Sequence, residues 1–113
     1  MRRRRSVRLN QYLPVLWTLG EGAQNGWGRL LDLSAVGARL LTRGVLTGEE
    51  IFLSFELETE KFNKLRCRVA RAEQDRDGYW VYGLEIAEDA ARARLKQRLM
   101  SILSRAGQAG IDG

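Results

Sequence analysis

Asp32, Ser34 and Gly37 are the residues whose types and spacing best suit ligand chemistry in this sequence. Asp32 and Ser34 lie two apart, so in an extended chain both side chains point to the same side. Gly37 follows, and glycine takes a positive φ at no steric cost, which suits a sharp reversal. A carboxylate and a hydroxyl placed in this way could bind a polar ligand. The alternative is a turn in which Asp and Ser bond their own backbone, and this stretch alone favours that alternative.

A cluster of arginines at the start of the chain is the second candidate. Five of the 19 Lys and Arg residues are Arg2, Arg3, Arg4, Arg5 and Arg8, and no acid lies among the first eight positions. The remaining basic residues balance the 14 acidic ones, so the body of the chain is neutral and its net charge of +5 belongs to the tail. Such a tail should attract phosphates on nucleic acid, a membrane surface or a nucleotide. A solubilising arm is the alternative.

Several other kinds of chemistry have no support in the sequence. It contains no His and a single cysteine, Cys67, so a His base, a His/Cys metal site and an intrachain disulfide are not expected. It also lacks a GxxxxGK phosphate loop. No apolar run approaches the roughly 18 residues of a membrane helix, and no apolar h-region follows the basic start. We therefore expect a cytoplasmic protein that is not an enzyme and has no metal and no cofactor.

The candidate residues must be positioned by strands, because apolar residues alternate with polar ones along most of the chain. Strands are expected at residues 9–19, 27–33, 37–42, 50–57, 65–70 and 80–86. Pro14 predicts an edge position or a bend in the first strand. Residues 58–64 are expected to form a charged hairpin connection. Cys67 falls on the inward face and is expected to be a small core residue.

The period of the apolar residues changes to that of a helix over residues 88–105. Glu88 and Asp89 supply acids and a cap at its start. The apolar stripe consists of Ala91, Leu95, Leu99, Ile102 and Leu103. Its default role is to cover the open end of a barrel, and docking of a partner or of a second copy as a homodimer is the alternative.

These elements predict an all-β fold, a small six-stranded antiparallel β-barrel with a C-terminal amphipathic α-helix. A length of 113 residues fits one domain. We expect a basic arm at residues 1–8, a barrel at 9–87 and the helix at 88–105.

The two candidate clusters together resemble a known family. Arg4 and Arg8 form an RxxxR pair, and Asp32, Ser34 and Gly37 form a DxSxxG turn. In this order and at this separation they resemble the PilZ domain, a bacterial family of receptors for cyclic di-GMP. The family is a six-stranded barrel, often followed by a helix, in agreement with the strand count above.

RxxxR alone carries no weight, since residues 39/43 and 94/98 have the same spacing. The similarity continues through Cys67–Arg71 and Tyr82–Ile86, so it covers nearly all of residues 4–87.

The resemblance implies that Arg4, Arg8, Asp32, Ser34 and Gly37 contact cyclic di-GMP. A guanidinium can bind phosphate oxygens or guanine O6/N7 and can stack on a purine. Asp32, assisted by Ser34, would accept from guanine N–H donors, and Gly37 would set the turn and permit close approach.

Arg3 directly precedes the RxxxR pair, where a basic residue in the family favours an intercalated ligand pair. We therefore add Arg3 to the site and expect a stacked dimer of the nucleotide.

Three functions are weighed. The first is a second-messenger receptor whose arm becomes ordered on binding and signals to a protein partner or a fused effector domain. The second is a nucleic-acid-binding barrel with a basic arm, against which the neutral body counts, so no nucleic acid is expected. The third is a ligand-independent protein-interaction module.

Other side chains have simpler interpretations. Trp27, Trp80 and Tyr82 could stack on a base, but aromatic residues on the strands of a small barrel are expected in its core. Arg66 and Arg68 are expected on a solvated strand face beside the site, with contact to a phosphate as the alternative.

Overall fold

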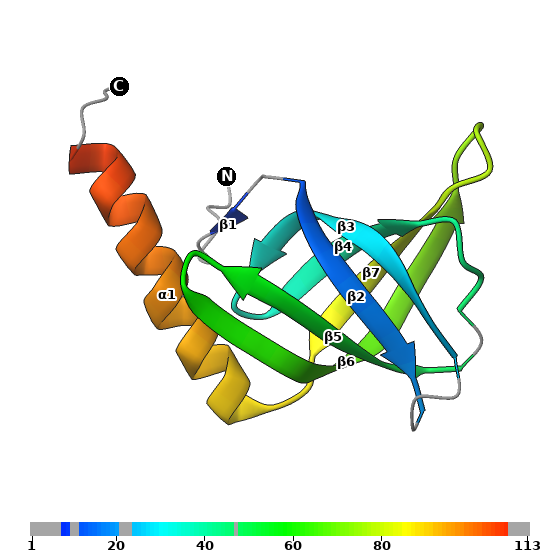
Figure 1. The fold of residues 1–113 in the computed structure, drawn as a ribbon, viewed down its shortest axis with the longest axis horizontal. Helices are drawn as coiled ribbons and strands as arrows, with labels where there is room; N and C mark the ends of the chain where they lie inside the picture. Colours follow the sequence, from blue (N-terminus) through cyan, green and yellow to red (C-terminus); the bar gives the residue numbers. More distant parts are fainter. Residues whose placement is uncertain (1–7, 10–11, 21–23, 47, 109–113) are drawn as a thin grey trace, which may run out of the picture.

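The computed structural model describes residues 8–9, 12–20, 24–46 and 48–108, and Figure 1 shows a closed antiparallel barrel with one helix across an end. The predicted six-stranded barrel with a C-terminal helix is confirmed. The barrel strands are β2 (Leu13–Leu19), β3 (Gln24–Ser34), β4 (Gly37–Thr42), β5 (Glu50–Leu57), β6 (Glu60–Gln74) and β7 (Trp80–Ile86). A two-residue strand, β1 (Arg8–Leu9), precedes them, and α1 (Asp89–Gln108) follows.

The barrel closes through β3. The strands follow the order β3-β2-β5-β6-β7-β4, and β4 pairs back onto β3. Closure leaves these strands with paired neighbours over most of their length, which removes the open edges of a flat sheet. β3 and β4 form a hairpin with a turn at residues 35–36. This turn lies at one end of the barrel, and the open end of the hairpin lies at the other.

The first predicted strand, 9–19, is interrupted. Leu9 of β1 pairs with Leu33, and Leu13 of β2 pairs with Leu30, so β1 and β2 lie one after the other along β3. Tyr12, in the break between them, is exposed. Pro14 pairs with β3, but the pairing of β2 with β5 begins only at Leu16. The edge position expected from Pro14 is therefore confirmed.

The charged hairpin expected at 58–64 is present, but its connection is shorter than predicted. β5 and β6 are joined by two residues, Glu58 and Thr59, and β6 begins at Glu60. Phe62 is fully buried, and its ring stacks on Phe55 with 5.2 Å between centroids. The density of charged residues around Phe62 masked one inward position in an otherwise exposed hairpin.

The barrel core consists of inward residues from every long strand, as the alternation predicted. Cys67 is fully buried, and burial raises the pKa of its thiol to about 12. Tyr82 is also in the core, and Trp80 is partly buried with its ring stacked on Tyr82. Trp27 is not in the core as expected: the residue is 71% exposed. It falls between two inward glycines, on the outer face of β3.

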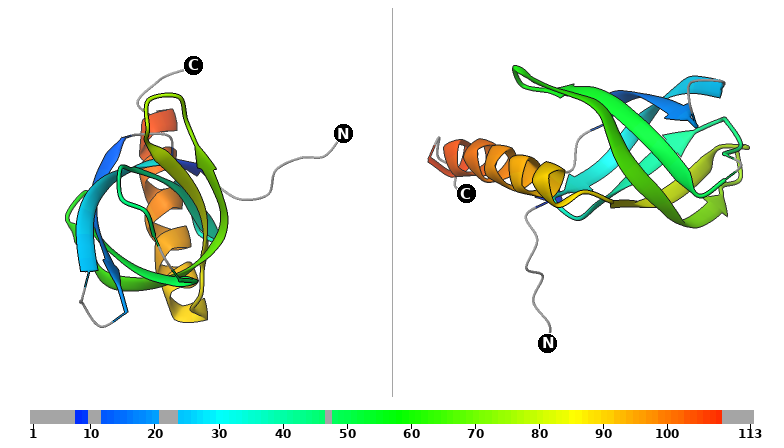
Figure 2. Two further views of the ribbon diagram at one scale, coloured as in Figure 1. Left: turned by 90° about the vertical axis from the view of Figure 1, so that its right-hand side faces the viewer. Right: turned by 90° about the horizontal axis from the view of Figure 1, so that it is seen from below.

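The helix begins at Asp89, and its backbone continues to Gln108, beyond the expected end at 105. Ala91, Leu95 and Leu99 are buried and Ile102 packs against the core, so the predicted stripe faces the barrel. Seen along the barrel, α1 crosses behind its far end (Figure 2). It contacts β1 and β3.

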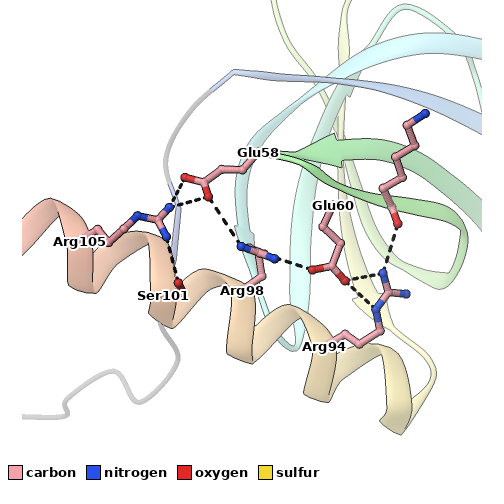
Figure 3. A network of polar contacts seen from close by, with 7 residues as sticks. Glu58, Glu60, Arg94, Arg98, Ser101 and Arg105 are labelled. Carbon is pink, nitrogen blue, oxygen red and sulfur yellow. Dashed lines mark hydrogen bonds and ion pairs between the residues drawn. The ribbon is translucent and has the colours of Figure 1, made fainter.

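Ion pairs fasten the helix to the β5–β6 hairpin (Figure 3). Glu60 accepts hydrogen bonds from Arg94 Nε at 2.9 Å and from Arg98 Nε at 3.1 Å. Glu58 accepts from Arg105 and pairs with Arg98. The hydrogen bonds from Arg94 and then Arg98 lower the pKa of Glu60. The hairpin and the helix are thus joined by polar contacts as well as by the core.

Candidate functional site

A β-bulge in β3 sets the face of the strand on which the candidate residues Asp32 and Ser34 lie. The pairs Leu30↔Leu40 and Asp32↔Arg39 leave Leu31 as an extra residue. Strict alternation would put Leu30 and Leu33 on opposite faces, but the bulge shifts the phase, and both are buried in the core. Asp32 and Ser34 consequently share the other face of the strand, as the spacing of these two residues predicted.

Ser34 holds the turn between β3 and β4. Its hydroxyl donates to the carbonyl oxygen of Gly37 at 3.2 Å and accepts from the N–H groups of Val36 at 3.3 Å and Gly37 at 3.2 Å. This is the self-bonded turn that the sequence offered as an alternative to a ligand role. Ser34 therefore stabilises the turn through its own hydrogen bonds to the backbone.

Gly37 has a different role from the one expected. It is not among the described glycines with a positive φ, so the predicted left-handed reversal is wrong. Its lack of a side chain matters because a Cβ there would lie 2.6 Å from the carbonyl oxygen of Leu84. Gly37 thus allows β4 to lie close against β7, and residues of both strands line the site.

Asp32 forms an ion pair with Arg39 across the hairpin. Arg39 Nε donates to Asp32 Oδ2 at 2.7 Å, and the carboxylate side chain is 4% exposed while that of Arg39 is 56% exposed. A buried carboxylate needs charged or hydrogen-bonding partners to be tolerated. Arg39 therefore orients Asp32 and leaves much of its own guanidinium accessible to a ligand.

A cleft of about 460 Å³ opens beside these residues. Its lining includes Asp32, Ser34 and Gly37 from the β3–β4 hairpin, so the structure brings these three predicted residues together. Arg39 belongs to the same wall, and β6 and β7 supply the opposite one with Arg71 and Gly83.

Arg71 reaches the cleft because of a second bulge. Val69 pairs with Leu84 and Arg71 pairs with Gly83, so Ala70 is the extra residue in β6. Without it Arg71 would share the inward face of Cys67 and Val69. A Cβ at Gly83 would lie 3.6 Å from Arg71 Cγ and Nε, so the arginine stem passes over the bare glycine backbone. In the described residues, no acid forms an ion pair with Arg71.

The predicted arginines of the tail are placed only in part. Arg8 lies in β1, and its backbone pairs with Ser34. Arg3 and Arg4 lie outside the described residues. The register of β1 nevertheless brings the backbone of Arg8 opposite the serine of the DxSxxG turn.

The site residues predicted from the sequence did not include Arg39 and Arg71, which line the cleft. Arg39 could have been found, because a two-residue turn at 35–36 sets Ser34 opposite Gly37 and hence Asp32 opposite Arg39, a cross-strand pair of opposite charge. Arg71 gave no comparable signal, since a bulge reverses its expected face.

Arg66 and Arg68 face outward, as expected, and both pair with acids. Arg66 contacts Glu50 and Glu88, and Arg68 contacts Glu85. Hydrogen bonds from Arg66 to Glu50 and then Glu88 raise the pKa of that guanidinium. Neither arginine lines the cleft.

The cleft can bind a ligand that combines anionic groups with hydrogen-bond donors. Two exposed guanidinium groups favour phosphate or a purine edge, and the carboxylate of Asp32 favours N–H donors. In the part of the chain that the structure describes, no group of His, Cys, Asp and Glu could hold a metal ion. Likewise, no helix there is long and apolar enough to span a bilayer.

The sequence matches the family model described as PilZ domain over residues 2–103. The comparison with curated proteins gave no match.

Solved structures with the same fold include the Bacillus subtilis inhibitor of motility, MotI/DgrA. It has a TM-score of 0.70 and 21% identity, over 93% of this chain and 53% of that protein. The PilZ domain of CeSA from a cellulose-synthesizing bacterium gives 0.62 and 22%, over 86% and 97%. Escherichia coli YcgR in complex with c-di-GMP gives 0.69 and 17%, over 95% and 48%. This chain thus spans about half the length of MotI and YcgR.

Proposed function

The chain belongs to the PilZ domain family, and from this premise we propose that it is a receptor for cyclic di-GMP (c-di-GMP), not an enzyme. One observation carries the proposal. Asp32, Ser34 and Gly37 meet at one cleft, and β1, which continues the arginine-rich start of the chain, pairs directly with Ser34. Arg8 and Asp32 are 24 residues apart in sequence, yet the strand that begins at Arg8 pairs with the strand that carries Asp32.

In this proposal Asp32 recognises a guanine. Its carboxylate accepts from the N–H donors on the base edge, while Arg39 holds it in position at 2.7 Å. Ser34 acts mainly by keeping the turn in shape, because its hydroxyl already bonds three backbone groups of that turn. Gly37 keeps β4 against β7 and so maintains the depth of the cleft.

Arginines on both sides bind the remainder of the nucleotide. Arg4 and Arg8 supply guanidinium groups from the tail for phosphate oxygens or guanine O6/N7. Arg71 supplies another from the opposite wall, where it lies over Gly83. Arg3 extends the cationic set and favours an intercalated pair of ligands, which predicts two nucleotides per chain.

The signal would pass from the ligand to β1 and α1. Ligand binding orders the arm against the cleft, and β1 is the segment that links the arm to the barrel. Since α1 contacts both β1 and β3, a change at β1 alters the surface next to the helix. A protein partner or a fused effector domain would recognise that surface.

Isothermal titration calorimetry with c-di-GMP, GTP and a short oligonucleotide tests the proposal. We expect c-di-GMP to bind with a ratio of two and the other two to bind far more weakly. Arg4→Ala, Arg8→Ala and Asp32→Asn should each weaken binding roughly 10- to 100-fold, because each removes charge-assisted hydrogen bonds. Arg76→Ala, in an exposed turn, is the matched control.

Equal affinity in wild type and in all three site variants would overturn the proposal. Binding to the oligonucleotide without guanine preference, steeply weakened by salt, would favour the nucleic-acid alternative instead. No response to any of the three ligands would favour the ligand-independent interaction module.

A further inference from the structure

A second groove lies at the end of the barrel opposite the candidate site. It is formed by the start of β3 and the end of β4, whereas Asp32 and Gly37 lie at the other end of the same hairpin. Its volume is about 750 Å³. We call it the Trp27 groove, after the exposed indole at its rim; the other rim residues used below are Asn25, Arg29, Arg43 and Tyr79.

The floor of the Trp27 groove is firmly built. Trp17 is 3% exposed, and its Nε1 donates to Thr42 Oγ1 at 3.1 Å. A Cβ at Gly26 or Gly44 would lie 2.5 or 2.6 Å from Trp17 Cζ2, so only glycine fits on either side of this ring. The groove is therefore preformed, which reduces the entropic cost of binding.

One wall of the groove exposes a strand edge. The pairing between β3 and β4 begins at Arg29↔Leu41, and in the described chain residues 24–28 pair with β2 alone. The carbonyl oxygen of Trp27 accepts from Thr42 Oγ1 at 3.1 Å, so it faces the β4 side. Because a strand has a period of two, the N–H and C=O of Asn25 face that side as well, beyond the last residue of β4.

The rim is aromatic and cationic. Trp27 is 71% exposed. The guanidinium of Arg43 lies 4.7 Å from the centroid of the Tyr79 ring. The described lining contains no Asp or Glu, and neither Arg29 nor Arg43 forms an ion pair with a described residue. Trp, Tyr and Arg are the residue types that dominate binding energy at protein interfaces.

From these features we infer that the Trp27 groove binds an extended, acidic peptide segment of a partner protein, which adds as a strand to the free edge of β3 at Asn25. An aromatic or branched apolar residue of that segment packs on Trp27, and its acids pair with Arg29 and Arg43. A single-stranded nucleic acid is less suited, because two arginines give no continuous track for a phosphate backbone.

A random-peptide selection against the intact chain tests the inference, with counter-selection against Trp27→Ser. We expect enriched sequences to carry Asp or Glu on both sides of an aromatic or branched apolar residue. For a synthetic peptide of the enriched sequence, Trp27→Ser should weaken binding about 30-fold, as truncation of a central hot spot does. Tyr12→Ser is the matched control, since Tyr12 is 69% exposed and outside the groove.

Amide hydrogen exchange distinguishes strand addition from other modes of binding. The N–H of Asn25 should exchange at least about tenfold more slowly in the peptide complex, because it gains a backbone partner. Thermal unfolding checks that Trp27→Ser remains folded.

Three results would overturn the inference: enrichment of basic or uncharged sequences, unchanged affinity in Trp27→Ser, or unchanged exchange at Asn25. Binding of a deoxythymidine decamer that Trp27→Ser abolishes would assign the groove to nucleic acid instead.

Discussion

The pair formed by Asp32 and Arg39 links stability to the candidate site at the scale of single residues. The Asp32 side chain is only 4% exposed, at the wall of the cleft, and Arg39 Nε supplies one of its hydrogen bonds at 2.7 Å. Arg39 also has more than half of its side chain in solvent. A residue in this arrangement stabilises the fold from one end of its guanidinium and can contact a ligand with the other.

Arg39→Ala should therefore weaken both folding and binding. We expect the free energy of unfolding to fall by about 1 kcal/mol, since a charge-assisted hydrogen bond is lost but solvent screens the exposed partner. Urea denaturation measures the change. Arg29→Ala, on the same hairpin but without an ion pair to a described residue, should change stability by less than about 0.5 kcal/mol. Equal stability of the Arg39→Ala variant and wild type would contradict this role.

Gly37 and Gly83 make a matched pair for a second test. Gly37→Ala places a Cβ 2.6 Å from a backbone oxygen, which must move, so we expect a loss of about 1–3 kcal/mol in the free energy of unfolding. Gly83→Ala meets only the side chain of Arg71 at 3.6 Å, and it should leave the unfolding midpoint in urea nearly unchanged. If the two variants had the same midpoint, the close approach of β4 to β7 would not be what requires glycine.

Residue types and spacing predicted part of the site. Asp32, Ser34 and Gly37 were found from their pattern, and their grouping at one cleft follows from the hairpin. The reason for Gly37 was wrong, because close packing on Leu84, a contact 47 positions away, cannot be seen in a local pattern. Arg71 was missed because Ala70 forms a bulge, and an extra residue in a strand leaves the alternation around it looking ordinary.

At the scale of elements, the β5–β6 hairpin and α1 depend on each other. The hairpin presents Glu58 and Glu60, and one side of the helix presents Arg94, Arg98 and Arg105 to them (Figure 3). Each exposed ion pair contributes little alone, but the set fixes where the helix lies across the barrel end.

Glu60 gives this contact a pH dependence. Its pKa in the folded chain is lowered from 4.5 by hydrogen bonds from Arg94 and Arg98. A lowered folded pKa stabilises the fold above the unfolded value, and that stabilisation is lost as the pH falls through the folded pKa. Glu60→Gln should therefore lower the melting temperature at pH 7 and have a smaller effect at pH 3.

Thermal melts of Glu60→Gln at the two pH values check this, with Glu56→Gln, exposed on β5, as the control. A difference from wild type that is the same at both pH values would mean that the carboxylate charge of Glu60 does not stabilise the helix contact.

The elements themselves were largely predictable. Period-two alternation located six strands, and the change of period located the helix. The failures have physical causes. Charges around Phe62 masked an inward residue, and the break at Tyr12 split a strand whose two parts keep the same partner. Trp27 faces outward because both inward positions beside it need glycine, Gly26 against Trp17 and Gly28 against the backbone of Leu41.

At the scale of the whole molecule, the β3–β4 hairpin carries two different surfaces at its two ends. The end with Asp32 lies near β1 and α1, and the end with Trp27 lies at the opposite mouth of the barrel. The proposed nucleotide and the proposed peptide would therefore bind without competing for space. A small barrel with a neutral body and a cationic tail can in this way combine a ligand site with a separate partner site.

A crystal structure of the chain with c-di-GMP would show directly whether Asp32 and the tail arginines bind one nucleotide. We predict that one guanine edge lies within hydrogen-bonding distance of the Asp32 carboxylate, while guanidinium groups of Arg4 and Arg8 contact the same nucleotide from the other side. A nucleotide bound away from Asp32, or bound there without either of these two arginines, would show that the two motifs do not form one site.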